Sequence, residues 1–457
     1  MAGISIELRR LYKEGKLGKV ALAFGYSAVL SAGNWLFAIL STFLSAYIVQ
    51  KLWGVSDVAI KYQVYITYVI SISLILSSPF QLSFTRYISD RLFEKDFDRV
   101  IPNTNGVLIL TAGYSFAIAV LLSFFLFRGM PYSYHAVFSF TVSVLSALWV
   151  INALLTGLKS YKHILFSFVF SYSLAGIGLV FLSRMGILWV MINFYVSQLI
   201  LLFLIMYRVA RDYSSSKVIE FDFLSKNRFY KSLALAGLFF NLGLWADKYL
   251  FWFNPITGSP VLGNIRASVV YDIPIVMALI SIVPGYAIAF LKVEMEFFRD
   301  YDAYYSAVRT WGKLRDLYRL ANRMIESAKS AFYETLRFQA IVAILIFWIQ
   351  EPIFRFLNLP LAYIPLFDIL LASNVLLIGY IAVYALLSYF DLRIELVIIT
   401  FVLFVLNSGF TYITHLLGPY YYGYGYMFSI VISLFLGMEY LRRFLNDVHY
   451  RTFVLRE

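Results

Sequence analysis

Four charged residues and a tyrosine stand close together in an otherwise apolar stretch, and they are the strongest candidates for chemistry in this sequence. Asp247 and Lys248 interrupt an apolar segment, and Arg266, Tyr271 and Asp272 follow a short polar turn. Two acids and two bases around one turn carry no net charge, so they can form ion pairs that fix a helical hairpin. The same groups can instead line a gate or a sugar-binding surface. Both interpretations stay open.

Amide side chains recur within the apolar segments and form a second group of polar candidates. An amide in an apolar helix more often connects helices than binds a ligand. Amides mixed with aromatic rings are nevertheless what a path for uncharged sugars requires. We therefore count as candidate path residues Asn34, Gln81 and Asn241, together with Arg86 at the end of the second apolar segment.

Residue types for metal binding, ATP hydrolysis and nucleophilic catalysis are missing or dispersed. The chain has no cysteine, which excludes disulfides, thiolate metal sites and a cysteine nucleophile. Its histidines, His135, His163, His415 and His449, are far apart in the sequence, so no metal-ligand spacing exists. A Walker phosphate-binding loop is also missing. We expect a protein that is not an enzyme and that needs no metal or cofactor.

The elements that carry these residues are apolar helices long enough to cross a membrane. Hydrophobic residues make up 61% of the 457 residues and charged residues 14%, and the mean hydropathy is +0.76. A span needs roughly 20 apolar residues, which predicts about twelve spans in an all-α membrane protein. The predicted spans are 22–49, 62–85, 104–127, 135–157, 164–183, 187–207, 232–253, 270–291, 336–357, 365–389, 394–416 and 422–441.

Basic residues are distributed unequally between the two sides of these spans. With the amino terminus in the cytoplasm, most of the 38 Lys and Arg residues face the cytoplasm, as the positive-inside rule requires. We therefore expect cytoplasmic amino and carboxyl termini. The net charge of +12 then suits an anionic inner leaflet, and we expect no nucleic-acid partner.

The predicted spans fall into two sets of six, separated by a polar stretch. We predict an N-terminal lobe at 1–207, a cytoplasmic linker at 208–231, a C-terminal lobe at 232–441 and a cytoplasmic tail at 442–457. Duplicated six-helix halves occur in many secondary transporters.

The C-terminal lobe contains a long polar insertion, 292–335, between the eighth and ninth spans. Apolar residues recur there at three- and four-residue steps from Val308 to Phe332, with basic residues on other faces, which predicts a basic amphipathic helix. Such a helix can lie on the inner leaflet or dock a cytoplasmic partner. The candidate docking residues are Arg315, Arg319, Arg323 and Trp311.

Several segments resemble one known family of membrane proteins. The runs WADKYLFWF (245–253), PVLGNIRASVVYDIP (260–274) and SIVPG (281–285) are similar to the PelG family, as are MAGISIELR (1–9) and FTRYISDRLF (84–93). The resemblance extends over nearly the whole chain, and the segment from Arg266 to Asp272 is its most specific part. Asn34 departs from the family, in which a proline is expected.

The resemblance implies an inner-membrane transporter of the Pel exopolysaccharide system, which serves biofilm formation. It implies the MATE-like fold of the multidrug/oligosaccharidyl-lipid/polysaccharide (MOP) flippase superfamily, with two six-helix lobes around a central cavity. It also implies a hexosamine-containing polymer as cargo and three partners: a PelF-like cytoplasmic glycosyltransferase, a PelD-like cyclic-di-GMP receptor and a PelE-like scaffold.

Two alternatives to polymer export stay open. A flippase for a lipid-linked oligosaccharide would need several Arg and Lys side chains toward its cavity to hold the pyrophosphate. A membrane scaffold of the synthase complex would need no path at all. For the exporter, we expect Arg266→Ala to lower export at an unchanged protein level.

Overall fold

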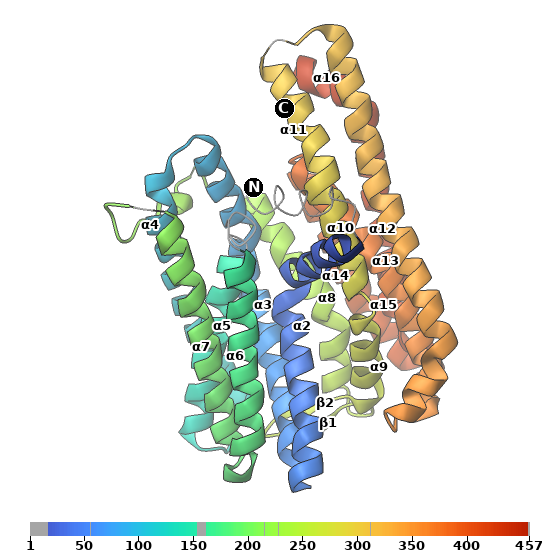
Figure 1. The fold of residues 1–457 in the computed structure, drawn as a ribbon. Helices are drawn as coiled ribbons and strands as arrows, with labels where there is room; N and C mark the ends of the chain where they lie inside the picture. Colours follow the sequence, from blue (N-terminus) through green and yellow to red (C-terminus); the bar gives the residue numbers. More distant parts are fainter. Residues whose placement is uncertain are drawn as a thin grey trace. The chain divides into compact units, whose positions relative to one another are not determined.

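The computed structural model describes residues 17–54, 56–152, 161–213, 215–226, 228–310 and 312–455, and nearly all of them are helical (Figure 1). Helices are expected because backbone groups in lipid must form their hydrogen bonds within the same segment. The chain divides into two compact units. Of the described residues, unit 1 comprises those within Gly33–Trp245 and Phe251–Val269, and unit 2 comprises those within 17–32, Ala246–Leu250 and 270–455.

Unit 1 is built from long helices that correspond to the first seven predicted spans. Short 3-10 turns follow α3, α6 and the polar stretch after α7. The helices are α2 (Leu17–Trp53, from Gly33 onward), α3 (Ser56–Phe93), α4 (Val100–Leu126), α5 (Tyr132–Asn152), α6 (Tyr161–Leu182), α7 (Ile187–Asp212) and α8 (Lys231–Phe253), the last of which contributes Ala246–Leu250 to unit 2.

Unit 2 is likewise helical. Its described elements from Val269 onward are α9 (Val269–Ile280), α10 (Val283–Leu291), the π-helical turn η5 (Lys292–Phe297), α11 (Phe298–Arg309), α12 (Leu314–Phe356), the 3-10 turn η6 (Leu361–Tyr363), α13 (Ile364–Tyr389), α14 (Arg393–Leu417), the 3-10 turn η7 (Pro419–Tyr421), α15 (Tyr424–Asn446), α16 (Val448–Tyr450) and a final π-helical turn, η8 (Arg451–Leu455).

Ten helical stretches among the described residues are long and apolar enough to cross a membrane. They correspond to ten of the twelve predicted spans, and residues 153–157 of the fourth predicted span lie outside the described residues. The other two predicted spans correspond to α2, whose segment Phe37–Trp53 forms a shorter apolar helix, and to α8, which carries Asp247 and Lys248. The all-α membrane fold is therefore confirmed, and the count of twelve stays a prediction.

A β-hairpin that the sequence did not predict follows α8. Strands β1 (Ser259–Leu262) and β2 (Ile265–Ala267) pair antiparallel. The residues between them are Gly263, whose φ is +59°, and Asn264. Glycine at a positive φ in a two-residue turn is a recognised hairpin signal, but the apolar helices on both sides obscured it.

The predicted amphipathic helix differs from the structure in two ways. Its first residues, Val308 and Arg309, are the last residues of α11, and a new helix, α12, starts at Leu314. From there α12 continues without a break through the ninth predicted span to Phe356. The amphipathic segment is thus an extension of a span. Trp311 lies outside the described residues.

Candidate functional site

The centre of unit 2 contains a buried ion pair formed by two neighbouring residues of α8. Asp247 is 0% exposed and Lys248 is 6% exposed. The Lys248 Nζ lies 3.1 Å from both carboxylate oxygens of Asp247. Adjacent residues do not share a helix face, so the flexible lysine side chain must fold back to make this contact.

Two further helices complete the hydrogen bonding of the Asp247 carboxylate. Tyr271 of α9 donates its hydroxyl to Oδ2 at 2.5 Å, and Asn407 of α14 donates its amide to Oδ1 at 3.1 Å. Thr411 in turn donates to the Asn407 side-chain oxygen at 3.0 Å. We call Asp247, Lys248, Tyr271, Asn407 and Thr411 the Asp247 cluster. These donors offset part of the cost of removing the carboxylate oxygens from water.

An aromatic ring also faces the buried ammonium group. The Lys248 Nζ lies 4.8 Å from the ring centroid of Tyr426, which is 1% exposed. A cation close to a desolvated ring gains electrostatic stabilisation. Sequence reasoning found Asp247, Lys248 and Tyr271. It did not connect Asn407 or Tyr426 with them, because nothing local links residues that are so distant in the sequence.

Arg266 has a different environment from the one predicted. It belongs to unit 1, and its guanidinium donates to the backbone oxygens of Trp252 at 2.9 Å and Gly258 at 2.5 Å. Arg266 forms no ion pair with any residue that the structure describes. The predicted four-charge cluster is therefore divided, with Asp247, Lys248 and Asp272 in the other unit.

The β-hairpin connects the end of α8 to two other helices of unit 1. The Tyr68 hydroxyl of α3 donates to the Arg266 carbonyl oxygen at 3.0 Å and accepts its amide at 3.2 Å. The Tyr68 ring stacks on Trp252 with 4.6 Å between centroids. Asn264 donates its backbone and side-chain amides to carbonyl oxygens at the end of α4. The β-hairpin is thus fixed to α3 and α4 largely through its backbone atoms, and we call these contacts the clamp around Arg266.

The remaining path candidates make local contacts. Asn241 donates to the Gly237 carbonyl oxygen of its own helix, and Gln81 donates to the Ser77 hydroxyl. Asp272 is half-buried beside Tyr271. The side chain of Asn34 lies outside the described residues. These placements do not decide between interhelical and path roles.

Arg86 belongs to a small group of polar side chains that connects α3 to the residue just before α8. Its Nε is 3.2 Å from Asp90, which also accepts the Tyr230 hydroxyl at 2.6 Å. Burial, together with the Asp90 carboxylate, raises the pKa of Tyr230, so this tyrosine keeps the proton that it donates. The group therefore holds the end of the linker against α3.

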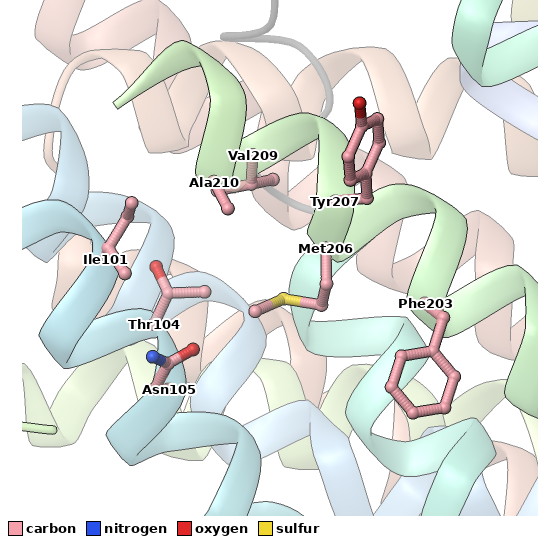
Figure 2. Close-up of a pocket in the computed structure, with 8 residues that line it drawn as sticks. All are labelled: Ile101, Thr104, Asn105, Phe203, Met206, Tyr207, Val209 and Ala210. Atoms are coloured by element: carbon pink, nitrogen blue, oxygen red, sulfur yellow. The ribbon is translucent and has the colours of Figure 1, made fainter. Parts of the chain in front are cut away.

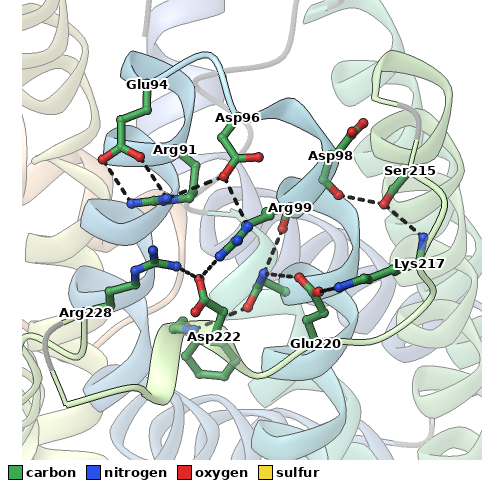
Figure 3. Close-up of polar contacts among 12 residues, drawn as sticks. Arg91, Glu94, Asp96, Asp98, Arg99, Ser215, Lys217, Glu220, Asp222 and Arg228 are labelled. Atoms are coloured by element: carbon green, nitrogen blue, oxygen red, sulfur yellow. Dashed lines mark hydrogen bonds and ion pairs between the residues drawn. The ribbon is translucent and has the colours of Figure 1, made fainter.

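The linker carries a dense ion-pair network that fixes it to the ends of α3 and α4 (Figure 3). Its centre is Asp222, which accepts from Arg99 at 2.9 Å, from Arg228 and from the Tyr87 hydroxyl at 3.0 Å. Beside it, Lys217 pairs with Glu220 at 2.5 Å. The described part of the predicted linker is thus a folded piece of unit 1.

Aromatic packing and one close backbone contact hold the same segment. Phe223 is 2% exposed and its ring contacts Phe80 and Phe84 of α3. Gly106, in the second turn of α4, faces the linker so closely that a Cβ there would lie 2.0 Å from the Glu220 carbonyl oxygen. Only glycine permits this approach.

A cleft of about 300 Å³ lies between the start of α4 and the end of α7 (Figure 2). Its lining is mostly apolar, with Thr104, Asn105 and Tyr207 as the polar members. Two of these side chains are already bonded, Thr104 to the Val100 carbonyl oxygen and Asn105 to that of Val218. The cleft thus offers few hydrogen bonds to a sugar.

Comparison with known proteins places the fold. No curated protein matches the sequence. A solved multidrug resistance MATE family transporter of the MOP superfamily, in an outward-facing conformation, aligns with a TM-score of 0.65 at 13% identity over 93% of this chain and 96% of its own. A solved MOP superfamily transporter from Pyrococcus furiosus aligns with the same TM-score, identity and coverages. A solved MATE protein in complex with Br-NRF aligns with a TM-score of 0.64 at 14% identity, over 98% of this chain and 99% of its own.

Among the described residues, no group of three or more His, Asp or Glu side chains is placed so that it could hold a metal ion. The sequence matches the family model "PelG: Putative exopolysaccharide Exporter (EPS-E)" over residues 1–453. The helical fold and its similarity to solved MOP superfamily proteins agree with that match. The segment 260–274, which resembles the family, includes most of the β-hairpin that contacts α3 and α4. This integral membrane protein belongs to the PelG family of exopolysaccharide exporters.

Proposed function

We propose that this protein exports a hexosamine-containing exopolysaccharide across the bacterial inner membrane, with both termini in the cytoplasm. The observation that carries the proposal is the family match over residues 1–453, in a chain with the fold of MOP transporters. We further propose that it acts in a complex with a PelF-like glycosyltransferase, a PelD-like cyclic-di-GMP receptor and a PelE-like scaffold. The Asp247 cluster and the clamp around Arg266 are its candidate gate elements.

The buried basic side chains bear on the choice between a mostly uncharged polymer and a lipid pyrophosphate as cargo. The buried basic side chains of the described residues are Arg91 and Lys248. Arg91 lies 2.8 Å from Glu94, and Lys248 lies 3.1 Å from Asp247. A pyrophosphate would need cationic groups that are not already neutralised. These two buried side chains are therefore not candidates for holding a pyrophosphate.

The test is polymer export by cells that lack their own exporter of this family and carry this chain. Secreted and cell-associated hexosamine polymer, lipid-linked saccharide and membrane protein level are measured together. We expect secretion to depend on the chain while the lipid-linked fraction stays constant. Accumulation of lipid-linked saccharide when the chain is removed would favour the flippase. Unchanged secretion at a normal protein level would refute export.

A further inference from the structure

Helix α12 is much longer than a membrane is thick. Its 43 residues extend about 65 Å at 1.5 Å per residue, whereas the hydrocarbon core of a bilayer is roughly 30 Å thick. Large apolar side chains exposed on α12 gather in its second half, from Ile341 to Phe356, with Trp348 79% exposed. Arg337 is the charged residue that precedes this stretch. The first half, 314–336, therefore projects beyond the hydrocarbon.

The projecting half is a folded hairpin with one covered face. It packs beside α11, with α16 close by (Figure 1), and its inward side chains Leu317, Ala321 and Met324 are buried. The ring centroid of Tyr318 lies 4.4 Å from that of His449 next to the C-terminal segment. The projection is thus held as part of unit 2.

The uncovered face carries mainly basic side chains, with Glu326 as an exposed acid after Arg323 on the same side of the helix. Arg315, Arg319 and Arg323 are exposed at four-residue steps, which places them in one stripe. Arg319 lies 3.3 Å from Asp316, but both are largely exposed, so this pair is weak. Arg315 and Arg323 form no ion pair with the described part of the chain. Tyr318, 51% exposed, adds an aromatic side chain of a type enriched, like arginine, in protein interfaces.

The distance of this stripe from the bilayer excludes anionic lipid as its main ligand. Along the helix, Arg323 is about 21 Å and Arg315 about 33 Å beyond Arg337. A tilt of roughly 40° shortens these heights by only about a quarter. Charges interact over a Debye length of about 8 Å at physiological ionic strength. Lipid headgroups can reach Arg337, but not the stripe.

We propose that the stripe Arg315–Arg319–Arg323 is the docking surface for an acidic face of a soluble protein. The proposal deepens the proposed function, because it names the surface that a partner of the export complex would use. Matching charge across such a surface speeds association and aligns the partner. The binding is therefore sensitive to salt and to the sign of the charge at these positions.

The test uses a photo-reactive amino acid at Asn322, an exposed residue beside the stripe, in living cells that produce the full chain. We expect a cross-link to a protein whose contact peptides, found by mass spectrometry, are rich in Asp and Glu. The double variant Arg315→Gln/Arg323→Gln should lower the cross-link at least fivefold. The matched control Lys329→Gln/Arg337→Gln, on the same helix near the membrane, should leave it unchanged.

A charge exchange then separates direct contact from an indirect effect. Arg315→Glu/Arg323→Glu should abolish the cross-link, and Lys substitutions of the acidic contact residues in the partner should restore it. Cross-links to lipid alone, equal losses in both double variants, or failed restoration would overturn the proposal. Secretion is measured in the same cells, so a chain that cross-links as expected without exporting polymer refutes the proposed function alone.

Discussion

At the residue scale, the Asp247 cluster contains a charge that an apolar bundle tolerates only with complete pairing. Removing a carboxylate from water costs several kcal/mol, which attraction to a cation repays only when hydrogen bonds satisfy the remaining oxygens. Lys248 supplies the cation, and Tyr271 and Asn407 supply the bonds. Loss of either charge leaves the other buried without its counter-charge.

This arrangement predicts the behaviour of three variants. Asp247→Asn alone and Lys248→Met alone should each destabilise the protein by about 3–5 kcal/mol, because each leaves one buried charge. Asp247→Asn/Lys248→Met should recover most of the loss, since asparagine still offers an oxygen to Tyr271. Thermal unfolding in detergent measures the stability. Full recovery of stability without recovery of export would place the pair on the transport path.

Arg266 gives a second prediction, which revises the one from the sequence. Its guanidinium bonds two carbonyl oxygens of the turn after α8, so Arg266→Ala should lower the amount of protein in the membrane together with export. Bonds from a charged donor contribute about 1.5–3 kcal/mol. Arg266→Lys should recover part of the level, because lysine can reach one carbonyl. Export lost at a full protein level would restore the functional interpretation.

The sequence predicted which residues carry unusual charge but not which partners they contact. Asp247 and Lys248 were identifiable because ionisable groups in apolar helices are costly. Their separation from Arg266 was not predictable, since the change of unit between residues 250 and 251 leaves no mark in composition. Asn407 is an ordinary amide in an apolar helix, and only folding shows that it meets Asp247.

At the element scale, long apolar helices were predictable because length and hydropathy determine them. The ordered structure of the linker was not predictable, because a polar sequence indicates exposure to water but not whether the segment folds. Its order depends on Phe223 packing against α3, on Asp222 and its basic partners, and on the room that Gly106 leaves. The described part of the predicted linker is thereby packed against α3 and α4, and we call this contact the latch.

Gly106→Ala tests that latch. The new methyl group would meet the Glu220 carbonyl oxygen, so the linker must move, at a cost of about 1–3 kcal/mol. We expect faster trypsin cleavage between Lys217 and Arg228 and a lower unfolding temperature. Gly113→Ala on the same helix meets nothing within 4 Å and should not increase cleavage. Equal cleavage of the two variants would mean that the latch does not depend on this contact.

At the scale of the whole molecule, the described residues include ten helical stretches that are long and apolar enough to cross a membrane, and the fold is similar to that of solved MOP superfamily proteins. The family match points further, to exopolysaccharide export. Composition alone predicted the membrane, and the distribution of basic residues predicted an orientation. Helix α8 is not among these ten stretches, because Asp247 and Lys248 lower its mean hydropathy.

The absence of cysteine permits a direct test of whether α8 crosses the membrane, because a single introduced thiol is the only one to react. Ser216→Cys in the linker and Ile256→Cys after α8, where the isoleucine is 86% exposed, lie on either side of the helix. We expect a membrane-impermeant maleimide to label Cys at 256 in intact cells, and Cys at 216 only after permeabilisation. The reason is that the basic linker stays in the cytoplasm. Labelling of both thiols from the same side would mean that α8 does not cross, and the twelve-span topology would then be wrong.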